Sequence, residues 1–282
     1  MKHFIRTKIK RLAVATEIFL ALFALVGQAQ TAFVYDTGSE LLTSGDFNGD
    51  GIADVLVLDK STGNARVGYL DTNGVIAWSA PLVSGAENVT GAAVGQFLTP
   101  GSDSLAVTAP GLNRINLISL ANSNNAGTPV VITPVGIGPH TLVTLLDPLG
   151  LGGSPAPTLL VASSDNAASA ELMESLQISS GVPTPAGSFS ETAEFDRGNA
   201  LLLANSPTLA AGLVRGDTDR FDLLQFTNPP GSILLSLTNL PSGGDYVFGN
   251  FNGEPLPRII LYQPGTSNLT VVALVTNSSG RL

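Results

Sequence analysis

Short strand-like segments, in which hydrophobic positions alternate with polar ones, recur along most of the chain. Examples are ARVGYL at 65–70, RINLISL at 114–120 and SILLSL at 232–237. This alternation predicts strands, and the Gly, Pro, Asn and Asp residues between the segments predict turns. One stretch, AASAELMESLQI at 167–178, also fits a helix, and there the strand interpretation is weakest. We therefore expect an all-β fold built from many short strands.

The strand-like segments form an internal repeat. Five stretches, each a turn followed by a hydrophobic run, can be aligned with one another: 45–59, 95–107, 145–161, 200–214 and 249–263. Their anchor residues are 50, 49, 56 and 49 residues apart and are Phe47, Phe97, Leu146, Leu202 and Phe251. Four short strands in a unit of about 50 residues are typical of a β-propeller blade. The alternative is a β-sandwich in which the spacing is a coincidence.

The last repeat indicates how a ring of blades could close. It contains three strand patterns, near 245–250, 257–263 and 269–275. The segment FVYD at 33–36 precedes the first full repeat and could supply a fourth strand, which would remove an exposed sheet edge. We therefore predict a propeller of five four-stranded blades over 30–282, with the N-terminal strand completing the last blade. A fragment of a larger ring remains an alternative.

The first residues have the layout of a secretory signal peptide. Basic residues up to Arg11 precede the apolar run LAVATEIFLALFALVG, and Gly27 and Ala29 fit a cleavage site after residue 29. We expect residues 1–29 to be removed, and the rest to be secreted, periplasmic or at the cell surface without insertion into the membrane. An uncleaved anchor is the alternative, but the apolar run is short for a membrane span and contains Glu17.

Composition narrows the range of partners. The chain has 282 residues, of which only 12% are charged, so it can bury a sizeable core. It has no cysteine, and disulfides are therefore excluded. Residues 30–282 contain eight basic and 21 acidic residues, a net charge of −13. Nucleic acid is an improbable partner for such a chain, because phosphates require basic clusters, whereas cations are natural partners.

One loop, in GDFNGDGIADVLVLD at 45–59, carries a recognisable set of metal ligands. Side-chain oxygens stand at loop positions 1, 3, 5 and 9, and a backbone carbonyl is available at position 7: Asp46, Asn48, Asp50, Asp54 and Ile52. Several hard oxygen ligands on a short flexible loop suit Ca²⁺. Gly51 permits the sharp turn. An EF-hand would need helical flanks and a bidentate Glu at position 12, where this chain has Val57.

The loop and the strands around it resemble the FG-GAP or VCBS repeats, which are the blades of integrin-α-like propellers. In that family a D-x-[DN]-x-[DN]-G-x-x-D loop joins the first two strands of a blade. The match is specific over 45–59 and degraded over the other repeats. The resemblance implies one Ca²⁺, chiefly structural, with these ligands: Asp46, Asn48, Asp50, Ile52 and Asp54. The second loop has lost its ligands, since the corresponding residues are Gln96, Leu98, Pro100 and Ser104.

Residues for catalysis are scarce. His140, in a GPHT segment that we expect to form a turn, is the only histidine after the leader, and no G-x-S-x-G motif is present. We expect Trp78 to pack within a blade rather than to stack on a sugar. The prediction is a calcium-binding, non-catalytic module that binds an extracellular protein or glycan. The alternatives are a polysaccharide hydrolase or lyase on the same scaffold, and a structural module of a larger surface protein.

Overall fold

The structure is a computed structural model, and in its described residues every helix or strand element is a β strand. The all-β prediction is confirmed for this part of the chain, in which no helix able to cross a membrane is found. The chain divides into two compact units, Met1–Thr31 and Ala32–Leu282. The expected signal peptide, 1–29, lies outside the described residues. These are 34–36, 39–121, 128–145, 157–165, 170–191, 197–202, 209–215, 220–225, 232–238, 245–249, 258–263 and 265–273.

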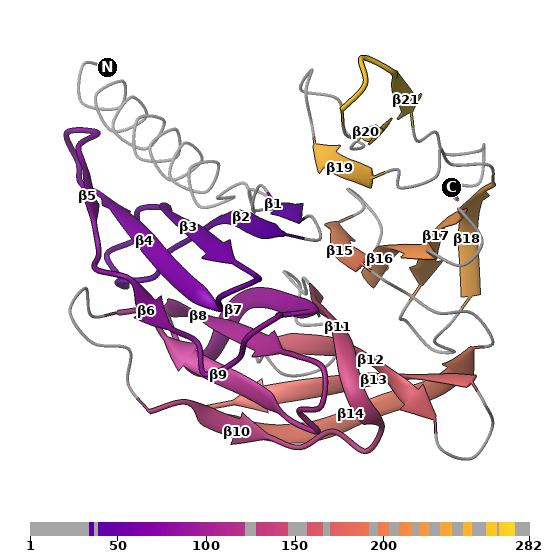
Figure 1. Ribbon diagram of the computed structural model, residues 1–282, viewed down its shortest axis with the longest axis horizontal. Helices are drawn as coiled ribbons and strands as arrows, with labels where there is room; N and C mark the ends of the chain where they lie inside the picture. The colour runs from indigo at the N-terminus through magenta and orange to yellow at the C-terminus, as the bar shows by residue number, and fades with distance from the viewer. Residues whose placement is uncertain are drawn as a thin grey trace, which may run out of the picture. The chain divides into compact units, whose positions relative to one another are not determined.

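The described strands form five antiparallel sheets, each from consecutive strands, as the colour ramp of Figure 1 makes visible. The first sheet contains β1 (Val34–Asp36), β2 (Glu40–Gly45), β3 (Asp54–Asp59), β4 (Asn64–Leu70), β5 (Ile76–Trp78) and β6 (Leu82–Val83). The second contains β7 (Gly91–Thr99), β8 (Ser102–Thr108), β9 (Ile115–Ser119) and β10 (Val130–Ile132). The third contains β11 (Ile137–Leu145), β12 (Thr158–Asp165), β13 (Ala170–Ser179) and β14 (Val182–Glu191).

The remaining two sheets follow the same order. The fourth contains β15 (Arg197–Leu202), β16 (Leu209–Arg215), β17 (Arg220–Gln225) and β18 (Ser232–Leu237). The fifth contains β19 (Asp245–Gly249), β20 (Arg258–Tyr262) and β21 (Leu269–Ala273). The aligned repeats coincide with these sheets, because their loops join β2 to β3, β7 to β8, β11 to β12, β15 to β16 and β19 to β20. The sequence repeat is therefore a repeat of one sheet.

The second sheet buries both of its faces. In β8, Leu105 and Val107 belong to a hydrophobic cluster shared with the first sheet. Ala106, between them, belongs to a cluster shared with the third sheet. Successive side chains of a strand point to opposite faces, so a strand covered on both sides is hydrophobic at consecutive positions. Full burial of a side chain such as Leu105 contributes about 2 kcal/mol to stability.

The third sheet is packed in the same way. In β12, Leu159 lies in the cluster shared with the second sheet, whereas Leu160 lies in a further cluster that includes Leu224 of the fourth sheet. The segment that also fitted a helix is β13, which pairs with β12 and β14. There Met173 and Leu176 belong to different clusters, so tertiary packing on two sides overrides the local helix propensity.

The prediction for the N-terminal strand is wrong. β1 pairs with β2 in the first sheet, with Val34 opposite Thr43, and it does not complete the fifth sheet in the described part of the chain. The fifth sheet contains three described strands. Only a short link separates β1 from β2, and pairing with a neighbour in sequence has a small loop-closure entropy cost.

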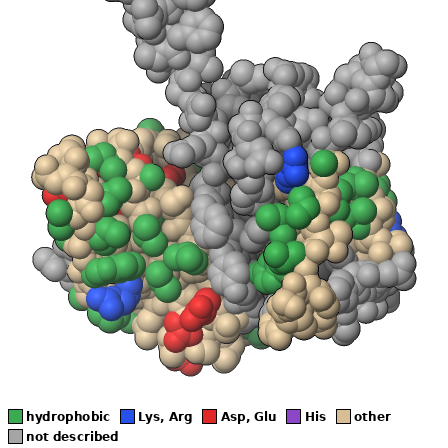
Figure 2. Space-filling view, turned by 90° about the horizontal axis from the view of Figure 1, so that it is seen from above, with side chains coloured by type: hydrophobic (Ala, Val, Ile, Leu, Met, Phe, Trp, Pro, Cys, Tyr) green, Lys and Arg blue, Asp and Glu red, His purple; other side chains and the backbone are tan. Residues whose placement is uncertain are grey.

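The described surface carries few charges. On the face drawn in Figure 2, hydrophobic and uncharged side chains cover most of the described area, and acidic and basic side chains are scattered among them. This agrees with a composition in which charged residues are 12% of the chain.

Candidate functional site

The candidate metal loop connects β2 to β3, whose pairing ends at Gly45 opposite Asp54. Between these residues the backbone passes through Gly49 (φ 79) and Gly51 (φ 83). These are left-handed conformations, which glycine adopts without the steric cost that a side chain would bring. The turn leaves residues 48–51 exposed to solvent.

Asp46 organises this turn. Its Oδ1 accepts hydrogen bonds from the N–H groups of Gly49 at 2.7 Å and Asp50 at 3.1 Å. Its Oδ2 accepts one from the N–H of Gly51 at 2.8 Å. One carboxylate thus satisfies three backbone donors and wraps the loop around itself, which explains why an acceptor with two oxygens stands at the first loop position.

Asn48 and Asp50 lie beside each other in the exposed part of the loop. Asn48 Nδ2 donates to Asp50 Oδ2 at 2.9 Å, and the N–H of Ile52 donates to Asp50 Oδ1 at 2.8 Å. Each carboxylate oxygen has two lone pairs, so an oxygen that accepts one hydrogen bond keeps capacity for a cation. The structure therefore brings three of the predicted ligands together: Asp46, Asn48 and Asp50.

Asp54 has a different place. Its side chain is fully buried, its Oδ2 accepts the N–H of Phe47 at 3.1 Å, and its Oδ1 accepts the N–H of Leu70 on β4 at 2.9 Å. Burial raises the pKa of Asp54, and the charge of Asp50 raises it further, while the hydrogen bonds from Leu70 and Phe47 lower it. Asp54 thus ties the base of the loop to the next strand of the sheet.

Asp103 on β8 is a carboxylate at this site that sequence reasoning missed. Its Oδ2 accepts the N–H of Asp46 at 2.9 Å, and its own N–H donates to the Asp46 carbonyl at 2.6 Å. Burial raises the pKa of Asp103, and the nearby Asp46 charge adds to this. A Cβ at residue 45 would lie 2.6 Å from Asp103 Oδ2, so Gly45 leaves room for this contact. The loop is therefore docked on the second sheet.

The second sheet repeats two of the hydrogen bonds of this loop with neutral side chains. Asp46 Oδ2 accepts the N–H of Gly51, and at the equivalent position 50 residues later Gln96 Oε1 accepts the N–H of Gly101 at 3.1 Å. In both loops a side-chain oxygen at the first position holds the glycine of the turn. An amide is therefore sufficient for this bond.

The same equivalence holds at the closing position. Asp54 accepts the N–H of Phe47, and Ser104 Oγ accepts the N–H of Phe97 at 3.2 Å. Both phenylalanines are fully buried. A hydroxyl can thus close the loop where a carboxylate does so in the first sheet.

The donor chemistry of the first loop fits a hard cation, since its side chains offer carboxylate and amide oxygens. In the described residues, no group of three or more His, Cys, Asp or Glu side chains is gathered as a metal site. At this loop the carboxylate of Asp54 accepts hydrogen bonds from the N–H groups of Phe47 and Leu70.

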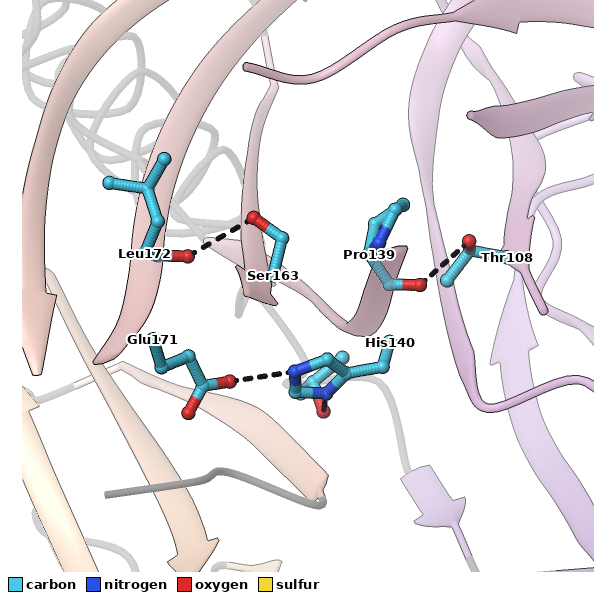
Figure 3. A network of polar contacts seen from close by, with 7 residues as sticks. Thr108, Pro139, His140, Ser163, Glu171 and Leu172 are labelled. Carbon is cyan, nitrogen blue, oxygen red and sulfur yellow. Dashed lines mark hydrogen bonds and ion pairs between the residues drawn. The ribbon is translucent and has the colours of Figure 1, made fainter. Parts of the chain in front are cut away.

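His140 lies in β11 rather than in the turn that we expected. Its Nε2 is 3.0 Å from Glu171 Oε1 on β13, and the two side chains are 23% and 5% exposed (Figure 3). Close by, Thr108 Oγ1 donates to the Pro139 carbonyl at 3.0 Å, which links the second sheet to the third. His140 is therefore part of the contacts that hold β11 against its neighbours.

Trp78 also differs from its prediction. It is the single tryptophan of the chain and the last residue of β5, and 48% of its surface is exposed. It therefore lies at the edge of the first sheet and is not buried between sheets.

Comparisons with known proteins show no family. No protein-family model and no curated protein matches the chain. Among solved structures, a functionally unknown protein from Desulfotomaculum acetoxidans matches with 15% identity over 74% of this chain and 72% of its own, at a TM-score of 0.44. A protein from Lactobacillus plantarum matches with 14% identity over 87% and 84%, at 0.42. A rhamnogalacturonan lyase from Bacillus licheniformis matches with 11% identity over 86% and 52%, at 0.43. Similarities at these scores carry no argument about function.

Proposed function

We propose that this chain is an exported, non-catalytic binding protein whose five sheets are the blades of one β-propeller. The proposal is supported by the agreement between the sequence repeat and the sheets. It is also supported by the second and third sheets, each of which buries both faces against its neighbours. The blades of a propeller pack in this way around a central axis, and their loops form faces on which ligands bind. An extracellular protein or glycan is the proposed partner.

The first loop holds one Ca²⁺ in this proposal. The observation that carries it is the comparison with the second loop, where the neutral side chains of Gln96 and Ser104 each make one of the bonds made by Asp46 and Asp54. These two hydrogen bonds do not require charge, yet three carboxylates are present in the first loop. Like charges so close repel one another unless a cation compensates them.

The residues that would hold the ion are the ligands predicted from the sequence: Asp46, Asn48, Asp50, Ile52 through its carbonyl, and Asp54 after rotation of its side chain. Bound Ca²⁺ would supply positive charge at this point and fix the β2–β3 hairpin against β8. Its role is structural, because it stabilises the loop that Asp103 already docks on the second sheet.

A thermal melt tests the calcium site. We expect saturating Ca²⁺ to raise the melting temperature of residues 30–282 above that in EDTA by about 5–10 °C, since a ligand at 100 times its Kd stabilises by about 2.7 kcal/mol. Asp50→Asn should abolish most of this shift. Asp71→Asn is the matched control, because Asp71 also accepts backbone bonds in an exposed turn, from Asn73 and Val75. Equal melts with Ca²⁺ and EDTA would refute the calcium site.

The non-catalytic role is tested separately. Purified protein should bind glycans or surface proteins on arrays without converting them. If the protein degrades a polysaccharide, and His140→Gln abolishes that activity, the chain is an enzyme and the binding proposal fails.

A further inference from the structure

Trp78 lies against the backbone of β4 at the edge of the first sheet. It stands opposite Gly68 in the β4–β5 pair. A Cβ on Gly68 would be 3.2 Å from both Cη2 and Cζ2 of the indole, so the absence of a side chain there gives the ring its place. With 48% of its surface exposed, Trp78 keeps a large aromatic area in solvent.

Arg66 is fixed beside this indole. Its guanidinium carbon is 5.7 Å from the centroid of the Trp78 ring, and its Nε donates to the Ser79 carbonyl at 3.3 Å. Ser79 is itself held by Val67, whose N–H donates to Ser79 Oγ at 3.0 Å and whose carbonyl accepts the Ser79 N–H at 2.7 Å. In the described part of the chain the terminal amino groups of Arg66 donate no hydrogen bond, and the side chain is exposed.

The neighbouring surface is hydrophobic. Ile76, on the same strand, is 43% exposed, and its Cγ2 would meet a Cβ on Gly68 at 2.7 Å. Val75 and Val83 are 62% and 65% exposed. We name the surface formed by Arg66, Ile76 and Trp78 the Trp78 platform. It combines a flat apolar area with one oriented positive charge.

Resting on the proposed binding function, we infer that the Trp78 platform binds a sugar ring that carries a carboxylate, that is, a uronate residue of an acidic polysaccharide. The apolar C–H face of the sugar stacks on the indole, and the carboxylate accepts hydrogen bonds from the free amino groups of Arg66. Arginine suits a carboxylate because its planar donors match two oxygens. Tryptophan and arginine together are the side chains that most often dominate binding energy at interfaces.

The charge of the platform selects among ligands. A neutral sugar would stack on Trp78 but leave the Arg66 donors without a ligand. A nucleic acid would meet one cation at the platform, which does not provide the basic cluster that phosphates require. One carboxylate on the stacked sugar ring matches the single guanidinium. The platform is therefore complementary to one uronate ring.

The single tryptophan makes a direct assay possible, because all indole fluorescence comes from the platform. Titration with tetragalacturonate should change this fluorescence in a saturable way, whereas cellotetraose, a neutral sugar of the same length, should bind at least about tenfold more weakly. Arg66→Gln should weaken tetragalacturonate binding by about tenfold to a hundredfold, because a charged hydrogen bond is lost. Arg114→Gln is the matched control and should leave the binding unchanged, because Arg114 is an exposed arginine that immediately precedes β9.

Calorimetry with Trp78→Ala completes the test, since that variant has no indole signal. We expect its affinity for tetragalacturonate to fall by about tenfold or more. Equal affinity for the two sugars, or unchanged binding in Arg66→Gln, would overturn the inference. If array partners bind but tetragalacturonate does not, or binds wild type and Trp78→Ala equally, the platform is refuted and the proposed binding function stands. If nothing binds on the arrays or in the titration, both are refuted.

Discussion

The replacement Asp54→Ala tests how strongly one side chain couples the candidate metal loop to the first sheet. The carboxylate of Asp54 is fully buried and accepts two N–H groups, one from Phe47 in the loop and one from Leu70 on β4. Alanine leaves both donors without an acceptor. An unsatisfied buried donor costs about 1–3 kcal/mol, so the two together cost about 2–6 kcal/mol.

Part of this loss is offset, because the buried charge of the Asp54 carboxylate is itself unfavourable. Burial raises the pKa of Asp54, which means that its charged form is less favourable in the folded chain than in water. Removal of that charge recovers part of the cost, and we expect a net loss of about 2–4 kcal/mol at pH 7. Ser104→Ala is the matched control. Ser104 Oγ accepts the N–H of Phe97 and donates to the Gly95 carbonyl, and its removal leaves one buried donor without an acceptor, so Ser104→Ala should cost about 1–3 kcal/mol, less than Asp54→Ala, which leaves two.

The assay is equilibrium unfolding in urea, with EDTA present so that no cation contributes. Trp78 reports on the first sheet, because β5 pairs with β4 at Leu70 opposite Ile76. The comparison is valid when the free energy of unfolding falls with urea concentration at the same slope in all variants. A loss below about 1 kcal/mol for Asp54→Ala, or a larger loss for Ser104→Ala, would show that the two hydrogen bonds do not couple the loop to β4.

Three further substitutions test other features of the first two sheets. Burial raises the pKa of Asp103 above its ordinary value of 3.8, so its neutral form stabilises the folded chain below pH 3.8, and this stability is lost as pH rises through the higher folded pKa. Asp103→Asn should reduce the loss, which is measured as the fall in the urea midpoint from pH 3.5 to 7. Gly63→Ala should cost at least about 2 kcal/mol in the same unfolding assay, because residue 63 has φ 67 and its Cβ would lie 1.7 Å from the Ala86 carbonyl. Gly68→Val should displace Trp78 from β4, seen as a shift of its emission spectrum, and an unchanged spectrum would contradict the contact.

The hairpins could be predicted from the sequence because they depend on local patterns. The turn glycines and the anchors Phe47 and Phe97 recur at one spacing, and the structure places both anchors in buried clusters of successive sheets. The strands of the last repeat, near 245–250, 257–263 and 269–275, agree with β19, β20 and β21 within two residues. A sequence repeat of this kind predicts where the strands of each sheet lie, because every sheet packs against its neighbours in the same way.

Other features depend on partners far away in the sequence and could not be predicted. Asp103 contacts Asp46 across 57 residues, and it does not stand at a ligand position of its own repeat. The exposure of Trp78 depends on Gly68, the residue opposite it on the neighbouring strand. The closure of a ring predicted β1 in the fifth sheet, whereas β1 pairs with its neighbour in sequence, β2.

The two loops also show why a lost ligand motif need not mean a lost loop. Gln96 accepts the N–H of Gly101 and Ser104 accepts the N–H of Phe97, so the second hairpin keeps one bond equivalent to a bond of Asp46 and one equivalent to a bond of Asp54, although it has lost every acidic ligand position of the motif. A neutral loop needs no compensation for charge, whereas the acidic loop must balance repulsion that rises as its carboxylates are desolvated. Placing Gln and Ser in the first loop, as Asp46→Gln with Asp54→Ser, should therefore keep the hairpin while removing its response to Ca²⁺. A folded variant whose melting temperature still rises with Ca²⁺ would show that the ion binds elsewhere.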